Sequence, residues 1–177
     1  MMCAAGTARA KTILPDACGD DGVKFDVSTQ KSAAPPAAPA DGKAQIIFIE
    51  NENMGLGFGR HATVRFGMDG AWVGADNDNS YFVADVAPGE HHLCVSWQSA
   101  LGMLKKSIDV SSFTAEAGKV YYFAANINIT AINGASGPGV TSGGGGANIQ
   151  FGLGQLNDDE GKYRVKAWKL ATWKTNK

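Results

Sequence analysis

Short runs of β-branched and aromatic residues, separated by turn-forming residues, recur along most of this 177-residue chain. The clearest runs are Ala44 to Glu50 (AQIIFIE) and Val120 to Ile129 (VYYFAANINI), which have the length and composition of strands. Between the runs lie Asp69-Gly70 and Pro88-Gly89, dipeptides that favour tight turns. No strand–helix–strand alternation is visible, so the chain has to bury its apolar side chains by packing sheets together.

Six further runs have the same character, and acidic residues at 157–160 indicate the first turn of a short C-terminal helix. The six runs are Ala62 to Met68, Ala71 to Ala75, Tyr81 to Val86, His91 to Trp97, Ser107 to Phe113 and Ile149 to Leu156. The sequence therefore predicts an all-β fold, an antiparallel β-sandwich with a short C-terminal helix.

Composition narrows the class of partner. The chain is 44% hydrophobic and 19% charged, with a net charge of −1, which is typical of one globular domain. Its lysines and arginines are scattered, so we expect no nucleic-acid partner. No apolar run approaches the roughly 20 residues of a membrane helix, and we expect no membrane span.

The first ten residues are similar to the end of a secretory signal. Ala8-Arg9-Ala10 has the small-x-small pattern of a cleavage site, although small residues also cluster by chance near many N-termini. We interpret residues 1–10 as the remnant of a signal peptide that begins upstream, with Lys11 as the mature N-terminus. Lipidation of Cys3 is the minor alternative, because Met1 and Met2 fit poorly before a lipidated cysteine. The prediction is a periplasmic or secreted protein.

Three parts follow the predicted cleavage site. Residues 11–30 form an N-terminal segment, in which Gly22 to Val27 alternates apolar and polar residues like a short edge strand. Residues 31–43 (KSAAPPAAPADGK) have the composition of an extended linker. Residues 44–177 are predicted to hold the sandwich and its helix.

The stretch PGEHHLCVSW, residues 88–97, suggests a metal or nucleophile site. Side chains alternate along a strand, so His91 shares a face with Leu93 and Val95, whereas His92 shares the opposite face with Cys94. The two histidines cannot then bind one ion. No further cysteine pair completes a zinc site, and we predict no metal here.

Cleavage would leave two cysteines, Cys18 and Cys94, and an even pair in an exported protein suggests a disulfide. Such a bridge would tie the N-terminal segment across the outer face of the sheet and place Val23, Phe25 and Val27 over it. Two free thiols are the alternative if the protein is cytosolic.

Other motifs are weaker. Residues 76–80 (DNDNS) resemble the start of a calcium loop, but Tyr81 and Ala87 stand where a glycine and a glutamate are needed, so a hairpin turn is favoured. The glycine-spaced loops at 51–59 and 131–147 lack the nucleotide-binding spacing. They could form a rim for a small ligand or carbohydrate with Phe58, Arg60 and His61.

Nothing in the sequence indicates catalysis, since no Ser-His-Asp order or carboxylate pair stands out. We predict no catalytic residue, no cofactor and no enzyme activity. A basic, aromatic segment at 162–174 is expected to dock its apolar residues on the sheet and leave its lysines in water. Contact with a membrane or a partner is the alternative reading of that segment.

Three motifs carry a resemblance: the hairpin Asp69 to Gly74 (DGAWVG), the turn Pro88 to His91 (PGEH) and the late strand Ala117 to Tyr122 (AGKVYY). Over about Ala44 to Ile129 the chain resembles small bacterial envelope domains of unknown function, often found in lipoproteins, and more loosely the PEGA-type surface domains. The resemblance implies an Ig-like or PEGA-like sandwich in the cell envelope, and no catalytic residues. We therefore expect a non-catalytic envelope module with a structural or protein-interaction role and an unidentified envelope partner.

Overall fold

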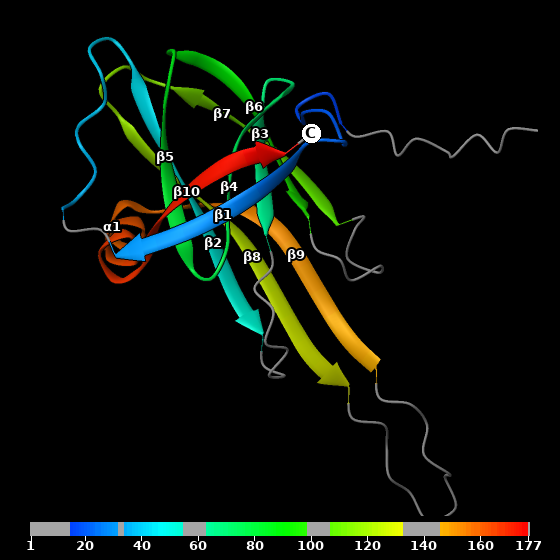
Figure 1. Ribbon diagram of the computed structural model, residues 1–177. Coiled ribbons are helices and arrows are strands. Elements are labelled where there is room, and N and C mark those ends of the chain that lie inside the picture. Colours follow the sequence, from blue (N-terminus) through cyan, green and yellow to red (C-terminus); the bar gives the residue numbers. More distant parts are fainter. Residues whose placement is uncertain (1–14, 32–33, 55–62, 99–106, 133–145, 177) are drawn as a thin grey trace, which may run out of the picture.

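The computed structural model of the chain describes residues 15–31, 34–54, 63–98, 107–132 and 146–176. Within them the backbone forms ten strands and one helix, in two sheets (Figure 1). The elements are β1 (Lys24–Lys31), β2 (Ala44–Met54), β3 (Val64–Met68), β4 (Ala71–Asp76), β5 (Ser80–Val86), β6 (Gly89–Trp97), β7 (Ile108–Ala115), β8 (Val120–Ile132), β9 (Gly146–Leu156), α1 (Asp158–Ala167) and β10 (Lys169–Asn176). The predicted all-β sandwich with a short C-terminal helix is confirmed.

The strand order is β1-β10-β5-β2-β8-β9 in the larger sheet and β4-β3-β6-β7 in the smaller one. The smaller sheet is antiparallel throughout. The larger sheet is mixed, because β2 pairs with β8 and β5 pairs with β10 in parallel. Between β2 and β8 the chain builds the whole of the smaller sheet, and this long crossover is what allows the parallel pairing.

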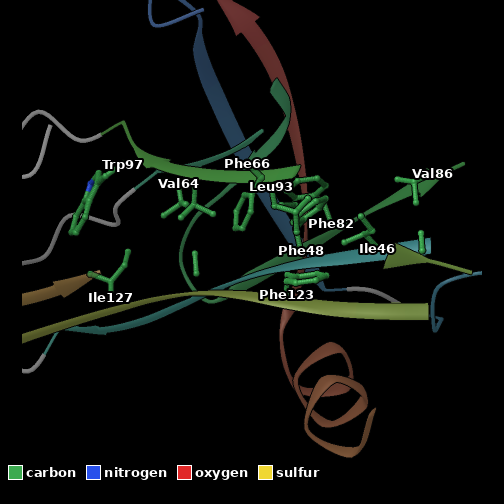
Figure 2. Close-up of a cluster of buried hydrophobic side chains, with 14 of the residues drawn as sticks. Ile46, Phe48, Val64, Phe66, Phe82, Val86, Leu93, Trp97, Phe123 and Ile127 are labelled. Carbon is green, nitrogen blue, oxygen red and sulfur yellow. The ribbon is translucent and has the colours of Figure 1, made fainter. Parts of the chain in front are cut away.

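The main core lies between the two sheets. Aromatic rings meet at its centre, where Phe48 of β2 lies 5.0 Å from both Phe66 of β3 and Phe82 of β5. Figure 2 shows these side chains filling the space between the layers. Trp97 and Ile127 extend the same core towards one end.

The helix covers part of the opposite face of the larger sheet. Val165 and Trp168 pack there against Ile47 of β2 and Tyr122 of β8. Asn157 caps the helix, since its side chain accepts a hydrogen bond of 3.0 Å from the Glu160 amide. The predicted acidic first turn is therefore confirmed.

The chain after the helix forms a strand that the sequence analysis did not predict. Strand β10 alternates its side chains between the two faces, so Ala171 and Trp173 pack in the main core while Thr172 and Lys174 remain exposed. The ring of Trp173 lies 4.7 Å from that of Phe82. The apolar residues of this segment were expected to dock on the sheet. Ala171 and Trp173 pack in the core instead as part of β10, which lies within the larger sheet between β1 and β5.

The predicted edge strand near residue 25 is confirmed as β1. It pairs antiparallel with β10 along its full length, from Lys24↔Asn176 to Lys31↔Lys169, and the two ribbons run side by side in Figure 1. Residues 34–43, from the predicted linker, lead from β1 back to β2 of the same sheet. The N-terminal segment is therefore part of the sandwich.

Strands β2, β8 and β9 continue beyond the neighbouring strand β5. The β2–β5 pairing ends at Ile49↔Tyr81, whereas β2–β8 reaches Met54↔Ile129 and β8–β9 reaches Ile132↔Gly146. The three strands form an arm that projects from the sandwich in Figure 1.

Candidate functional site

Cys18 and Cys94 form a disulfide, as predicted, with their Cα atoms 5.2 Å apart. Cys94 lies on β6 and points away from the main core, as strand alternation requires. Both residues are nonetheless buried, with 6% and 0% of their surfaces exposed. The N-terminal segment itself covers this outer face of the smaller sheet.

Strand β3 makes room for the covering segment at a glycine. Gly67 pairs with Cys94 and sits at a bulge in the β3–β4 pairing. A Cβ atom on Gly67 would lie 3.0 Å from the Ala17 carbonyl oxygen and 3.1 Å from the Cys18 Cα. The close approach of two backbones therefore favours glycine here, since a side chain would force the neighbouring backbone to shift.

A buried arginine holds the same segment without a covalent bond. The Arg65 side chain donates to the main-chain oxygens of Asp21 (3.2 Å) and Val23 (2.9 Å), to Asp21 Oδ1 (3.3 Å) and to Ser96 Oγ (3.1 Å). Burial lowers the pKa of Arg65, and Asp21 only partly opposes this. The covering segment supplies most of the acceptors of the buried guanidinium, whose Nε has no hydrogen-bond partner among the described residues.

Trp72 completes the arrangement. The Arg65 guanidinium lies 4.4 Å from the Trp72 ring centroid, and Trp72 Nε1 donates to the Asp20 carbonyl at 2.7 Å. We call the Cys18–Cys94 bond, Arg65 and residues 15–23 the clasp. Arg65 was not predicted from the sequence, where its signal is a lone charge in a run of otherwise apolar character. In the structure it pairs with Ser96 of β6.

The expectation that Val23, Phe25 and Val27 all cover the outer face of the smaller sheet is wrong for Phe25 and Val27. Phe25 and Val27 belong to β1 in the other sheet, and Val27 packs against the main core. Gln98 brackets the start of β1, accepting from the Phe25 amide at 2.8 Å and donating to its carbonyl at 2.7 Å. The chain crosses between sheets after Val23, so residues 15–23 cover the face.

The adjacent histidines point in opposite directions, as predicted. His92 is exposed, whereas His91 is buried. His91 Nδ1 lies 2.6 Å from Asp69 Oδ2, and its Nε2 lies 2.8 Å from the Ala87 carbonyl oxygen. Asp69 Oδ1 also accepts from the His92 amide at 2.9 Å. Asp69 therefore fastens the β3–β4 turn to β6.

This geometry favours a charged imidazole. A carboxylate and a carbonyl both accept hydrogen bonds, so each ring nitrogen of His91 needs its own proton. Burial by itself lowers the pKa of His91, but the Ala87 carbonyl and Asp69 outweigh it and raise the pKa above 6.5. The pair is a structural ion pair that occupies both histidine nitrogens.

The motif at 76–80 forms a turn with two left-handed residues, Asp78 and Asn79, at φ of 59° and 51°. It joins β4 to β5, which lie in different sheets, so it links the sheets and is not the hairpin turn that we expected. Asp78 Oδ2 forms an ion pair with Lys169 of β10 at 2.5 Å.

Two carboxyl side chains are fully buried beside this turn. Glu50 Oε2 accepts a hydrogen bond of 2.9 Å from the Asn79 amide. Both Asp76 oxygens are buried without a hydrogen bond in the part of the chain that the structure describes. Burial, and secondly the charge of Glu50, raise the pKa of Asp76 well above 3.8, and the nearby Glu50 amide only partly opposes them. In the folded protein Asp76 is therefore still protonated at pH 3.8, the ordinary pKa of an aspartate.

No three histidine, cysteine, aspartate or glutamate side chains converge as metal ligands within the described ranges. No described helix is long and apolar enough to cross a membrane. The predicted ligand rim of Phe58, Arg60 and His61 lies outside the described residues, as does most of the glycine-rich loop after β8.

Comparisons with protein-family models, curated proteins and solved structures found no match to this chain.

The His91–Asp69 pair predicts a pH dependence of stability. Because the pKa of His91 is raised above 6.5 in the fold, its contribution is complete below pH 6.5 and is lost as the pH rises through the folded-state pKa. We expect the free energy of unfolding, from urea titrations, to fall over this range in the wild type and in His92→Gln. His91→Gln is expected to flatten that fall. An unchanged pH profile in His91→Gln would contradict the assignment.

Asp76 predicts a stabilising substitution. Because the pKa of Asp76 is raised in the fold, the contribution of its protonated side chain to the free energy of unfolding is complete below about pH 3.8. That contribution is lost as the pH rises through the folded-state pKa. Asp76→Asn keeps the shape of the side chain but cannot ionise. We expect it to raise the free energy of unfolding at neutral pH, because the fold no longer has to take up a proton to avoid burying an ionised carboxylate. Exposed Asp41→Asn is the matched control; destabilisation by Asp76→Asn alone would show that the fold uses the ionised carboxylate.

Proposed function

We propose that the protein is a non-catalytic, exported module of the bacterial envelope that acts by holding or binding another envelope component. The observation that carries the proposal is the clasp. Disulfides persist in oxidising compartments and are rare in a reducing cytosol. Here the bond is buried on both sides and ties a segment that the smaller sheet needs as its cover.

The chemistry of the described side chains supports a binding role over catalysis. The His91–Asp69 pair has the composition of a catalytic dyad, but both nitrogens of His91 already contact acceptors of the fold. A general base needs a free nitrogen that can take a proton from a substrate. The likeness of the DGAWVG, PGEH and AGKVYY motifs to envelope domains points to the same kind of module.

Thiol labelling in cells of the native host tests this proposal. We expect Cys18 and Cys94 to react with a maleimide only after reduction, in protein recovered from the periplasm or the medium. Cys94→Ser is the control, because it should free Cys18 and allow labelling without a reductant. Wild-type protein found in the cytoplasm with both thiols reactive would overturn export and, with it, the proposed role.

A further inference from the structure

The outer face of the larger sheet carries a groove that the sequence analysis did not identify. Its volume is about 710 Å³, within the range of small-ligand sites. The floor consists of Ile47, Val120 and Tyr122, with Gln45 at the side. Residues 34–39 of the Pro/Ala segment form one wall, and helix α1 forms the other.

Both walls are held in place by specific contacts. Gln45 Nε2 donates to the Ala37 carbonyl at 3.1 Å and to Asp85 Oδ1 at 3.3 Å, which fastens the Pro/Ala segment to β2 and β5. Its prolines lack an N–H and cannot join the sheet as a regular strand. The segment therefore stands beside the sheet as a stiff, extended wall.

The helix is seated just as closely on the floor. A Cβ atom on Gly161 would lie 2.2 Å from the Tyr122 ring, so only glycine allows α1 to rest on that ring. This contact fixes the next residues of the helix along the edge of the groove. Lys162, Val165 and Lys166 line it from this side.

All charged side chains that line the groove are positive. Lys162 and Lys166 are its charged residues, and no acidic side chain lines the groove in the described part of the chain. Lys162 pairs with Asp158, but both partners are exposed, and such surface pairs are weak. Lys166 forms no ion pair with any residue that the structure describes. An apolar trough with two lysines on one rim suits a ligand with an apolar body and an anionic end.

We propose that this groove binds an amphiphilic anion, namely an acyl chain that ends in a carboxylate. The chain would lie on Ile47, Val120 and the prolines, and the carboxylate would contact Lys162 and Lys166. Two lysines are too few to hold a nucleic-acid backbone, and they disfavour a cationic amphiphile. The inference rests on the proposed binding role and adds the ligand class and the site.

Calorimetric titration with laurate, below its micelle-forming concentration, tests the ligand class. Dodecyltrimethylammonium and dodecyl maltoside have the same tail with a cationic and a neutral head. We expect saturable binding of laurate that is at least about tenfold tighter than binding of either control, since 1.4 kcal/mol corresponds to a factor of ten. No saturable binding of laurate, or equal binding of all three, would overturn the proposal.

Two variants test the site. Lys162→Gln with Lys166→Gln is expected to weaken laurate binding about tenfold, as the loss of two surface charge contacts implies. Ala38→Trp, at an exposed position on the Pro/Ala wall, is expected to block the groove. Lys24→Gln with Lys31→Gln, exposed on β1, should leave binding unchanged. Laurate binding that both groove variants leave intact would overturn the site, while the binding role and the thiol result would stand.

Discussion

The bond between Cys18 and Cys94 is the constraint on which the rest of the sandwich depends. It joins residues 76 positions apart and fixes the N-terminal segment on the outer face of the smaller sheet. From that face the chain passes directly into β1, which pairs with β10 at the edge of the larger sheet. One covalent bond therefore helps to position strands of both sheets. Arg65 adds a second attachment of different chemistry, because its buried guanidinium donates hydrogen bonds to carbonyl oxygens of the same segment.

The outer faces of the two sheets are covered in different ways. The cover of the smaller sheet is structural, whereas the cover of the larger sheet leaves room for a ligand. Residues 15–23 cover the smaller sheet through the disulfide, Arg65 and Trp72. The larger sheet has two partial covers, α1 and the Pro/Ala segment, and a groove remains between them. The His91–Asp69 ion pair lies elsewhere, at the turn between β3 and β4. The buried carboxyl groups of Asp76 and Glu50 lie beside the turn between β4 and β5. These groups contact other residues of the fold, whereas the groove presents apolar surface and two lysines to a ligand.

Local patterns made most of the strands, the Asp69-Gly70 turn, the helix cap and the cysteine pair predictable. Each depends on nearby residues or, for the disulfide, on the pair of cysteines that the predicted cleavage would leave in an exported protein. Strand β10 was missed because the basic residues at 162–174 obscure its alternation, and its partners β1 and β5 are distant in sequence. Arg65 and the groove were missed for a similar reason. Each is completed by the N-terminal or Pro/Ala segment, and composition cannot show where such a segment lies.

The clasp stabilises the whole sandwich through the disulfide and the contacts of Arg65. The most direct test is urea unfolding of the oxidised and the reduced protein, with hydrogen exchange of residues 15–31 followed in both forms without urea. We predict that reduction lowers the free energy of unfolding by about 4 kcal/mol, the chain-entropy value for a loop of this length. Exchange should become faster in residues 15–23 and in β1. Equal stability of the two forms, with β1 still protected after reduction, would contradict the account.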